Sequence, residues 1–189
     1  MMTSFEEFVG ALFKDIQPLS NFDIIRICKK LEISNFKGCF MRDEIKNFCG
    51  NDECFILNTD VSSSSGTHWV AVNIVDSSGT SDGVGTTYYF DSFGLEPIEE
   101  IKRYCKEPRF YNSFEFQKPN EVICGHLCLY FLYRMRYCKQ DFYSVLATNK
   151  VLICDTDVFA TSIWYKRYFN VRSPAIEKLA AKRKPMALY

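Results

Sequence analysis

The chain has 189 residues, a length that suits a single folded domain. Its 23 acidic and 23 basic residues balance to a formal net charge of zero, so overall charge gives no reason to expect nucleic acid as a partner. The composition is 47% hydrophobic and 16% aromatic, which excludes a disordered chain and indicates a globular domain with an aromatic-rich core.

Cysteine and histidine usage argues against disulfides and metal. The nine cysteines are odd in number and irregularly spaced, and none forms a CxxC pair. Two histidines are too few for a Cys/His zinc site, so we expect no metal and no cofactor. The start MMTSFEEFVG has no basic region followed by a long apolar run, and no stretch approaches ~18 apolar residues. We therefore expect an intracellular protein with no membrane association.

The N-terminal third is predicted to be largely helical. Residues 4–14 open with a capping-box pattern and carry apolar residues at helical spacing. Residues 21–31 have the same spacing, with Asn21 as the candidate N-cap. Residues 34–53 show no clear period and carry no prediction.

The middle of the chain is predicted to form a sheet. Segments rich in β-branched and aromatic residues cover 54–58, 67–75, 86–91 and 109–117. The run CGHLCLYFLYRMRYC is apolar nearly all round until Arg134, which predicts a buried helix starting at or near Cys124. Further helical segments are predicted at 141–147 and 156–168. Together these elements predict an α+β fold, with a mixed, mostly antiparallel sheet from the 54–117 region packed against the helix that starts at Cys124.

Two predicted strands bring a histidine and an aspartate together. His68 opens one strand and Asp91 closes the next. In an antiparallel hairpin the numbers of paired residues have a constant sum, and a sum of 159 centres the connection near 79–80. The turn-rich segment 76–85, DSSGTSDGVG, lies on that centre. We therefore expect His68 and Asp91 to lie side by side, to within one residue of register.

The third catalytic candidate is Cys124, at a predicted helix start. A helix N-terminus stabilises a thiolate and offers N–H donors to an oxyanion. His126 is two positions further along the same helix and points ~200° away from Cys124, so it cannot easily act as the base. His68 is the remaining histidine, and with Asp91 to orient it the three residues fit a nucleophile, base and orienting group.

Three further residues are candidates for contact with substrate. Gln117, at the end of a predicted strand, can donate a second hydrogen bond to the oxyanion. Gly125 allows a substrate to approach closely, and the ring of Trp69 can form one wall of the cleft. Each catalytic candidate also fits a structural role when taken alone: a buried cysteine, a polar strand end, a turn-opening aspartate, or a surface glutamine. The catalytic interpretation rests on their combination.

The combined pattern GTHWVAV, YYFDSFG and QKPNEVICGHLC resembles the adenovirus-type cysteine proteases, adenain and its relatives. Within that group it is most similar to the proteases of Polinton (Maverick) elements and adintoviruses, and the upstream stretch NFKGCFMRDEI is similar as well. The resemblance implies His68 as the base, Asp91 as the third triad member, Gln117 as the oxyanion donor and Cys124 as the nucleophile. The chain order His, Asp, Gln, Cys is that of the adenain and ubiquitin-like-protein protease clan.

The resemblance also implies an activity and partners. It implies an endopeptidase that cleaves viral structural precursor proteins such as capsid precursors, often after small residues, in the cytoplasm or nucleus of a host cell or in the virion. Adenain is stimulated by DNA and by a viral peptide attached through a disulfide, so an activating peptide or DNA is implied by resemblance only. The sequence around Cys105 does not match the peptide-linking site. We expect a monomer.

Two other functions stay open. Asp91 is shared with the ubiquitin-like-protein proteases, whereas adenain has Glu there, so a deconjugating isopeptidase is the first alternative. Six residues separate Gln117 from Cys124, with Pro119 among them, as in adenain, and this spacing outweighs the aspartate because it sets where the oxyanion donor lies. An inactive binding module on the same fold is the second alternative.

The chain is divided into one domain and a tail. Residues 1–172 are predicted to form a single papain-like-clan cysteine protease domain. Residues 173–189 are predicted to form a basic C-terminal tail, with the run Lys182-Arg183-Lys184.

Overall fold

The computed structural model describes residues 17–45, 52–76, 85–105 and 109–146. Predictions for residues 4–14, 156–168 and the tail 173–189 lie outside them. Within the described ranges, no helix is long and apolar enough to cross a membrane. Residues 142–146 are helical and form the described part of the segment predicted at 141–147.

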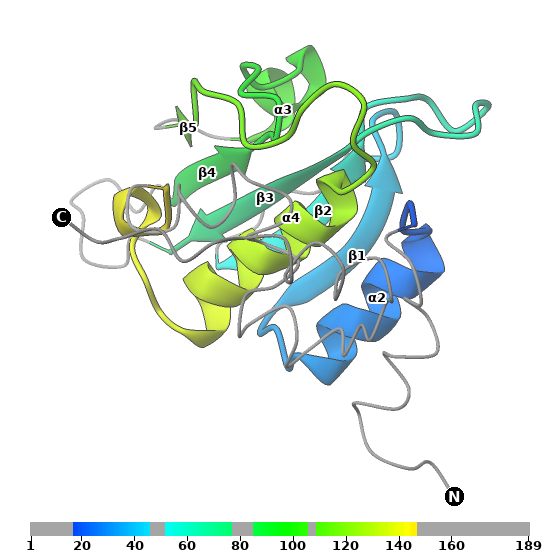
Figure 1. Cartoon of the computed structure of the whole chain (residues 1–189). Helices are drawn as coiled ribbons and strands as arrows, with labels where there is room; N and C mark the ends of the chain where they lie inside the picture. Colours follow the sequence, from blue (N-terminus) through cyan, green and yellow to red (C-terminus); the bar gives the residue numbers. More distant parts are fainter. Residues whose placement is uncertain (1–16, 46–51, 77–84, 106–108, 147–189) are drawn as a thin grey trace, which may run out of the picture.

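A five-stranded sheet is the centre of the fold (Figure 1). Its strands follow chain order and span Phe36–Met41 (β1), Glu53–Asn58 (β2), Trp69–Val75 (β3), Thr86–Phe90 (β4) and Arg109–Tyr111 (β5). The two central pairings, β2 with β3 and β3 with β4, are antiparallel, whereas β1 and β5 add in parallel at the two edges. The predicted α+β class with a mixed sheet is confirmed.

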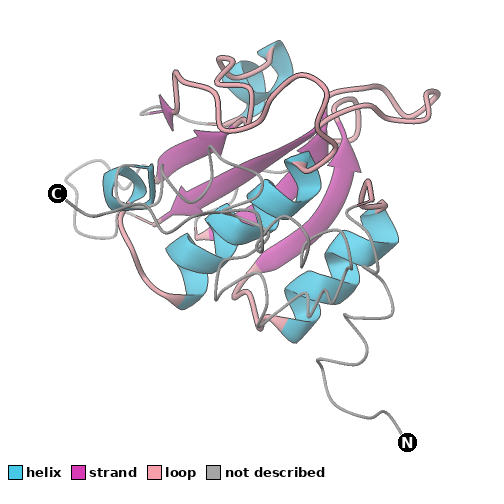
Figure 2. Ribbon diagram, viewed as in Figure 1, coloured by secondary structure: helices cyan, strands magenta, loops and turns pink. Residues whose placement is uncertain are grey.

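Helices cover both faces of this sheet (Figure 2). Helix α4, Cys124–Leu132, packs across one face together with α2, Asn21–Lys30, and every residue of α4 after Cys124 is buried. A π-helical turn, η1, continues α4 over Tyr133–Tyr137. On the other face a second core cluster includes Ile101 of α3, Glu99–Tyr104. The buried helix predicted at Cys124 is therefore confirmed.

The start of α2 differs by one residue from the prediction. Ser20, not Asn21, is the N-cap. The Ser20 hydroxyl accepts the backbone N–H of Asp23 at 3.3 Å, and the Asp23 carboxylate accepts the N–H of Ser20 at 3.1 Å. This reciprocal capping box satisfies two backbone donors at once, which is why the cap lies at the serine. It also fixes the chain that enters the helix.

The register of the β3–β4 hairpin is two residues away from the predicted one. Ala71 pairs with Phe90 and Val72 with Tyr89, so the paired numbers sum to 161 rather than 159. A shift of two keeps every side chain on its predicted face, because the side-chain period of a strand is two. His68 and Asp91, one residue outside the two strand ends, are therefore diagonal neighbours, within reach of each other across the hairpin.

The strand predicted at 109–117 is wrong beyond its first three residues, because β5 ends at Tyr111. After β5 the side chain of Asn112 bonds to the backbone of Asp91 in place of a ladder. The N–H groups of Phe116 and Gln117 then both bond to the carbonyl oxygen of Ser92, at 2.7 and 3.0 Å. The chain thus wraps around the turn after β4 instead of extending the sheet.

Gly94 closes that turn, and a larger residue at this position would destabilise the fold. Its φ is +72°, and a Cβ there would lie 2.6 Å from the backbone carbonyl carbon of Phe114. We expect Gly94→Ala to lower the free energy of unfolding by about 2–5 kcal/mol, from left-handed strain plus the backbone clash. Gly66→Ala is the matched control, since φ is +79° and the three atoms nearest its Cβ belong to the side chain of Asn58 instead of to backbone. Urea denaturation of both variants measures the difference, and equal losses would contradict the clash.

Candidate active site

The His68 and Asp91 side chains meet where the β3–β4 hairpin opens. Nε2 of His68 lies 2.9 Å from Oδ1 of Asp91, and the two residues are only 9% and 2% exposed. The same carboxylate oxygen accepts the backbone N–H of Phe93 at 2.7 Å, which fixes the carboxylate in the turn. The predicted pairing of these two residues is confirmed.

Cys124 completes the group from the first turn of α4. Its thiol is hydrogen bonded to the His68 ring and to the backbone N–H groups of Trp69 and Gly125. Because Nε2 of His68 is bound to Asp91, Nδ1 is the ring nitrogen left for the sulfur. Hydrogen bonds therefore link the thiol, the imidazole and the carboxylate in that order. This arrangement suits nucleophilic catalysis by cysteine.

The protonation of this group favours an ion pair. Burial lowers the pKa of His68, but hydrogen bonds to Asp91 and Cys124 outweigh burial and raise the pKa to about 9. Burial raises the pKa of the Cys124 thiol, but the hydrogen bond from His68 and that from the Trp69 backbone outweigh burial and lower the pKa below its ordinary value of 9.0. Both shifts act in favour of a thiolate facing an imidazolium, the reactive form of a catalytic cysteine.

Gln117 is held with its amide nitrogen available to the same site. Its Oε1 accepts the Ser92 hydroxyl at 2.9 Å, and its Nε2 donates to the carbonyl oxygen of Glu121. An amide nitrogen has two N–H donors, so one remains after the bond to Glu121. Gln117 and Cys124 line the same groove, and a hydrogen bond from this second donor to an oxyanion stays a prediction.

A groove of about 980 Å³ contains the site. Its walls come from the segment before α2, the end of β1, the loop before β3 and the loop before α4. The residues that line it are Pro18, Leu19, Ser20, Asn21, Cys39, Phe40, Met41, Glu44, Asn58, Ser65, Gly66, Thr67, His68, Trp69, Phe93, Gln117, Pro119, Glu121, Val122 and Cys124. Four of the predicted site residues, His68, Trp69, Gln117 and Cys124, are thus brought into one cavity.

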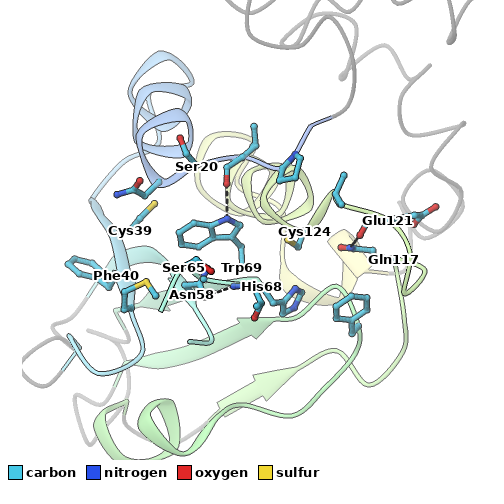
Figure 3. Close-up of a pocket in the computed structure, with 18 of the residues that line it drawn as sticks. Ser20, Cys39, Phe40, Asn58, Ser65, His68, Trp69, Gln117, Glu121 and Cys124 are labelled. Atoms are coloured by element: carbon cyan, nitrogen blue, oxygen red, sulfur yellow. Dashed lines mark hydrogen bonds between the residues drawn. The ribbon is translucent and has the colours of Figure 1, made fainter. Parts of the chain in front are cut away.

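Trp69 lies in the middle of the groove, as predicted for a cleft wall. Figure 3 shows its indole between the side that carries Cys124 and Gln117 and the side that carries Cys39 and Phe40. The indole Nε1 donates to the carbonyl oxygen of Leu19 at 2.9 Å, which holds the ring in place. The ring therefore separates the reacting end of the groove from a second arm, which carries Cys39 and Phe40 (Figure 3).

The structure gives Gly125 a packing role. Gly125 is buried and is not among the residues that line the groove. A Cβ on it would lie 3.2 Å from Leu19, 3.3 Å from Trp69 and 3.4 Å from Ile24, so a larger residue would push α4 away from α2 and the indole. Contact between Gly125 and a substrate stays a prediction, and only the backbone could make it.

His126, Cys128 and Cys39 do not share the site's chemistry. Burial lowers the pKa of His126 to about 3, so the ring is neutral, and its exposed fraction is 0%. Burial raises the pKa of Cys128 well above its ordinary value and that of Cys39 to about 12. The complete burial of His126 agrees with its exclusion as the base, and Cys128 belongs to the main core cluster.

Sequence reasoning missed three residues that build the site. Phe93 stacks on the His68 ring, with centroids 4.6 Å apart and planes at 29°. Asn112, 1% exposed, accepts the N–H of Asp91 at 3.0 Å and donates to its carbonyl oxygen at 2.6 Å. The third is Ser92, the partner of Gln117. The correct hairpin sum of 161 pairs His68 with position 93 and would have found Phe93, but no local pattern marks the other two.

No metal site accompanies this group in the described ranges, where no cluster of three or more His, Cys, Asp or Glu side chains could hold an ion.

Comparison with known proteins supports the fold. No family model matches the sequence, and no curated protein matches it. Among solved structures, the ASFV pS273R protease is similar, with a TM-score of 0.56 and 16% identity over 85% of this chain and 69% of that one. Its selenomethionine form gives a TM-score of 0.55 at 16% identity, over 84% and 70% of the two chains. At this identity the likeness shows that the chain has a fold used by a protease.

Proposed function

We propose that this protein is a cysteine endopeptidase. The observation that carries the proposal is the hydrogen-bonded chain from the Cys124 thiol through His68 to Asp91, at the floor of a groove that also holds Gln117. A buried core cysteine would have a raised pKa, as Cys128 has. The lowered pKa of Cys124 and its place in the groove fit a nucleophile instead. The shared fold with a solved protease supports the same conclusion.

The mechanism follows from the positions of these groups. The Cys124 thiolate attacks the carbonyl carbon of a peptide bond bound in the groove. The negative oxygen that forms is stabilised by the free N–H of Gln117 and by backbone N–H groups at the start of α4. His68, as imidazolium, gives its proton to the departing amine, and Asp91 keeps the ring oriented and stabilises its charge. Water activated by His68 then hydrolyses the thioester and releases the second product.

The substrate class is an extended polypeptide. The groove continues past Trp69 into the arm that carries Cys39, Phe40 and Met41, and Glu44 and Asn58 line the same groove, so it offers both apolar and polar contact to residues distant from the cut bond. The sequence motifs support a finer proposal, namely a processing enzyme of a Polinton-type or adintovirus-type element that cuts structural precursors after small residues. Action inside a host cell or a virion belongs to the same proposal.

One experiment separates the candidate functions. The reduced protein is incubated with a peptide library carrying Gly or Ala before the scissile bond, with capsid precursor, and with isopeptide-linked ubiquitin-like modifiers, and products are mapped by mass spectrometry. We expect cleavage of peptide and precursor, and covalent labelling of the Cys124 thiolate by an electrophilic peptide probe. Cleavage of the modifiers alone would make the protein an isopeptidase. No cleavage and no labelling of Cys124 would make it a binding module.

A further inference from the structure

The turn after β4 connects the catalytic base and the oxyanion donor through consecutive residues. Asp91 bonds to His68, and the next residue, Ser92, bonds to Gln117. Ser92 is completely buried, and its own carbonyl oxygen accepts the N–H groups of Phe116 and Gln117. Backbone and side chain of this one serine thus hold both the main chain and the amide of Gln117.

The hydrogen-bond directions around Gln117 fix its amide in one orientation. The carbonyl oxygen of Glu121 can only accept, so the group facing it must be Nε2. Oε1 is then the atom that faces Ser92, and the serine hydroxyl must be the donor. A rotation of 180° would set the amide oxygen against the Glu121 carbonyl and remove that hydrogen bond, and the Ser92 hydroxyl would have to accept from Nε2 instead of donating. Such a rotation would also present an acceptor instead of a donor to the groove.

We propose that Ser92 is a positioning residue, which holds the Gln117 amide with its N–H toward the oxyanion that forms on a substrate bound to Cys124. This inference rests on the proposed peptidase function. Without the hydroxyl, Oε1 of Gln117 is a buried acceptor with one strong partner lost, and the amide gains freedom to turn away. The benefit of Ser92 is therefore realised in the transition state, where the oxyanion exists, and not in the binding of substrate.

Ser92→Ala is expected to lower kcat for peptide hydrolysis by about 10- to 100-fold, with little change in KM, because one oxyanion donor contributes roughly 10²- to 10³-fold. The loss should not exceed that of Gln117→Ala. In the Gln117→Ala background the same serine substitution should change kcat by less than about threefold, since a residue that acts through Gln117 has nothing left to position. Ser92→Cys, which keeps the shape and weakens the donor, should show a smaller loss with the same pattern.

A purely structural role predicts different results. If Ser92 mattered only by supporting Asp91, Ser92→Ala would shift the pH dependence of Cys124 alkylation by iodoacetamide, and its cost would persist in the Gln117→Ala background. Either result would overturn the proposal. We expect the alkylation profile to be unchanged, because alkylation needs the thiolate and no oxyanion donor.

A readout without turnover separates this proposal from the proposed function. The side-chain NH₂ resonances of Gln117 are assigned by their absence in Gln117→Ala, and the N–H that donates to Glu121 should be sharp and protected from solvent exchange in the wild-type protein. It should lose protection in Ser92→Ala. Unchanged protection would refute positioning by Ser92. If the wild-type protein cuts no peptide but Ser92→Ala still loses this protection, the peptidase is refuted and the positioning is left intact.

Discussion

Replacing Cys124 by alanine should lower kcat/KM for peptide hydrolysis by about 10⁴-fold or more, because nucleophile, base and orienting carboxylate act as a unit. The fold should be preserved, since the thiol is only partly buried and its removal leaves α4 and its packing unchanged. Far-ultraviolet circular dichroism and the midpoint of urea unfolding check the fold. Initial rates on a fluorogenic peptide check the turnover.

A second thiol provides the control for this loss. Cys138 is exposed and lies after the π-helical turn, outside the groove. Cys138→Ala should keep full turnover and full labelling by a peptide electrophile, whereas Cys124→Ala should lose both. Cys39 lies in the groove, but burial raises its pKa to about 12, so it stays protonated and should not take the label. Retained turnover in Cys124→Ala would overturn the assignment of the nucleophile.

The positions of the candidate catalytic residues could be predicted from sequence because local patterns determine where these residues lie. Strand propensity on either side of a turn-rich segment was enough to bring His68 near Asp91, although the register was two residues off. The error was harmless because an even shift preserves the face on which each side chain lies. The position of Cys124 followed from the start of a long apolar run, which only a buried helix accommodates.

The residues that support the site could not be predicted, because their roles depend on contacts between distant segments. Asn112 matters because it replaces the ladder that β5 would have continued, and a strand period cannot show that side chain bonding to Asp91. The edge strand β1 was missed because a register irregularity between Phe36 and Cys39 disturbs its period of two. Its place in the sheet is set by pairing with β2 and not by its own pattern.

The pH dependence of the reaction should be bell-shaped, and the titration of the Cys124–His68 pair should set both of its limbs. The active form needs the thiolate and the imidazolium together. Activity should be lost as the pH falls through the lowered pKa of Cys124, because the thiolate becomes protonated. It should be lost again as the pH rises through about 9, the raised pKa of His68, because the leaving amine then lacks its proton donor. Measurement of kcat/KM against pH gives both limbs.

Alkylation of Cys124 by iodoacetamide should show the acid limb alone, since this reaction needs only the thiolate. The rate should rise through the pKa of Cys124 and stay high above pH ~9, where hydrolysis has already fallen. A matching fall in alkylation at high pH would indicate unfolding and not loss of the imidazolium. The other histidine cannot produce either limb, because burial lowers the pKa of His126 to about 3.

Replacing His68 by alanine should both raise the pKa of the Cys124 thiol and strongly reduce turnover. Without the imidazolium, burial of Cys124 is opposed only by backbone N–H groups, so the alkylation midpoint should rise toward or above the ordinary value of 9.0. Turnover should fall by about 10³-fold or more, because both the thiolate and the proton donor are lost. An unchanged alkylation midpoint in His68→Ala would show that the helix start alone sets the pKa of Cys124. In that case the hydrogen bond between His68 and the sulfur would contribute nothing to the nucleophile, and His68 would act only on the leaving group.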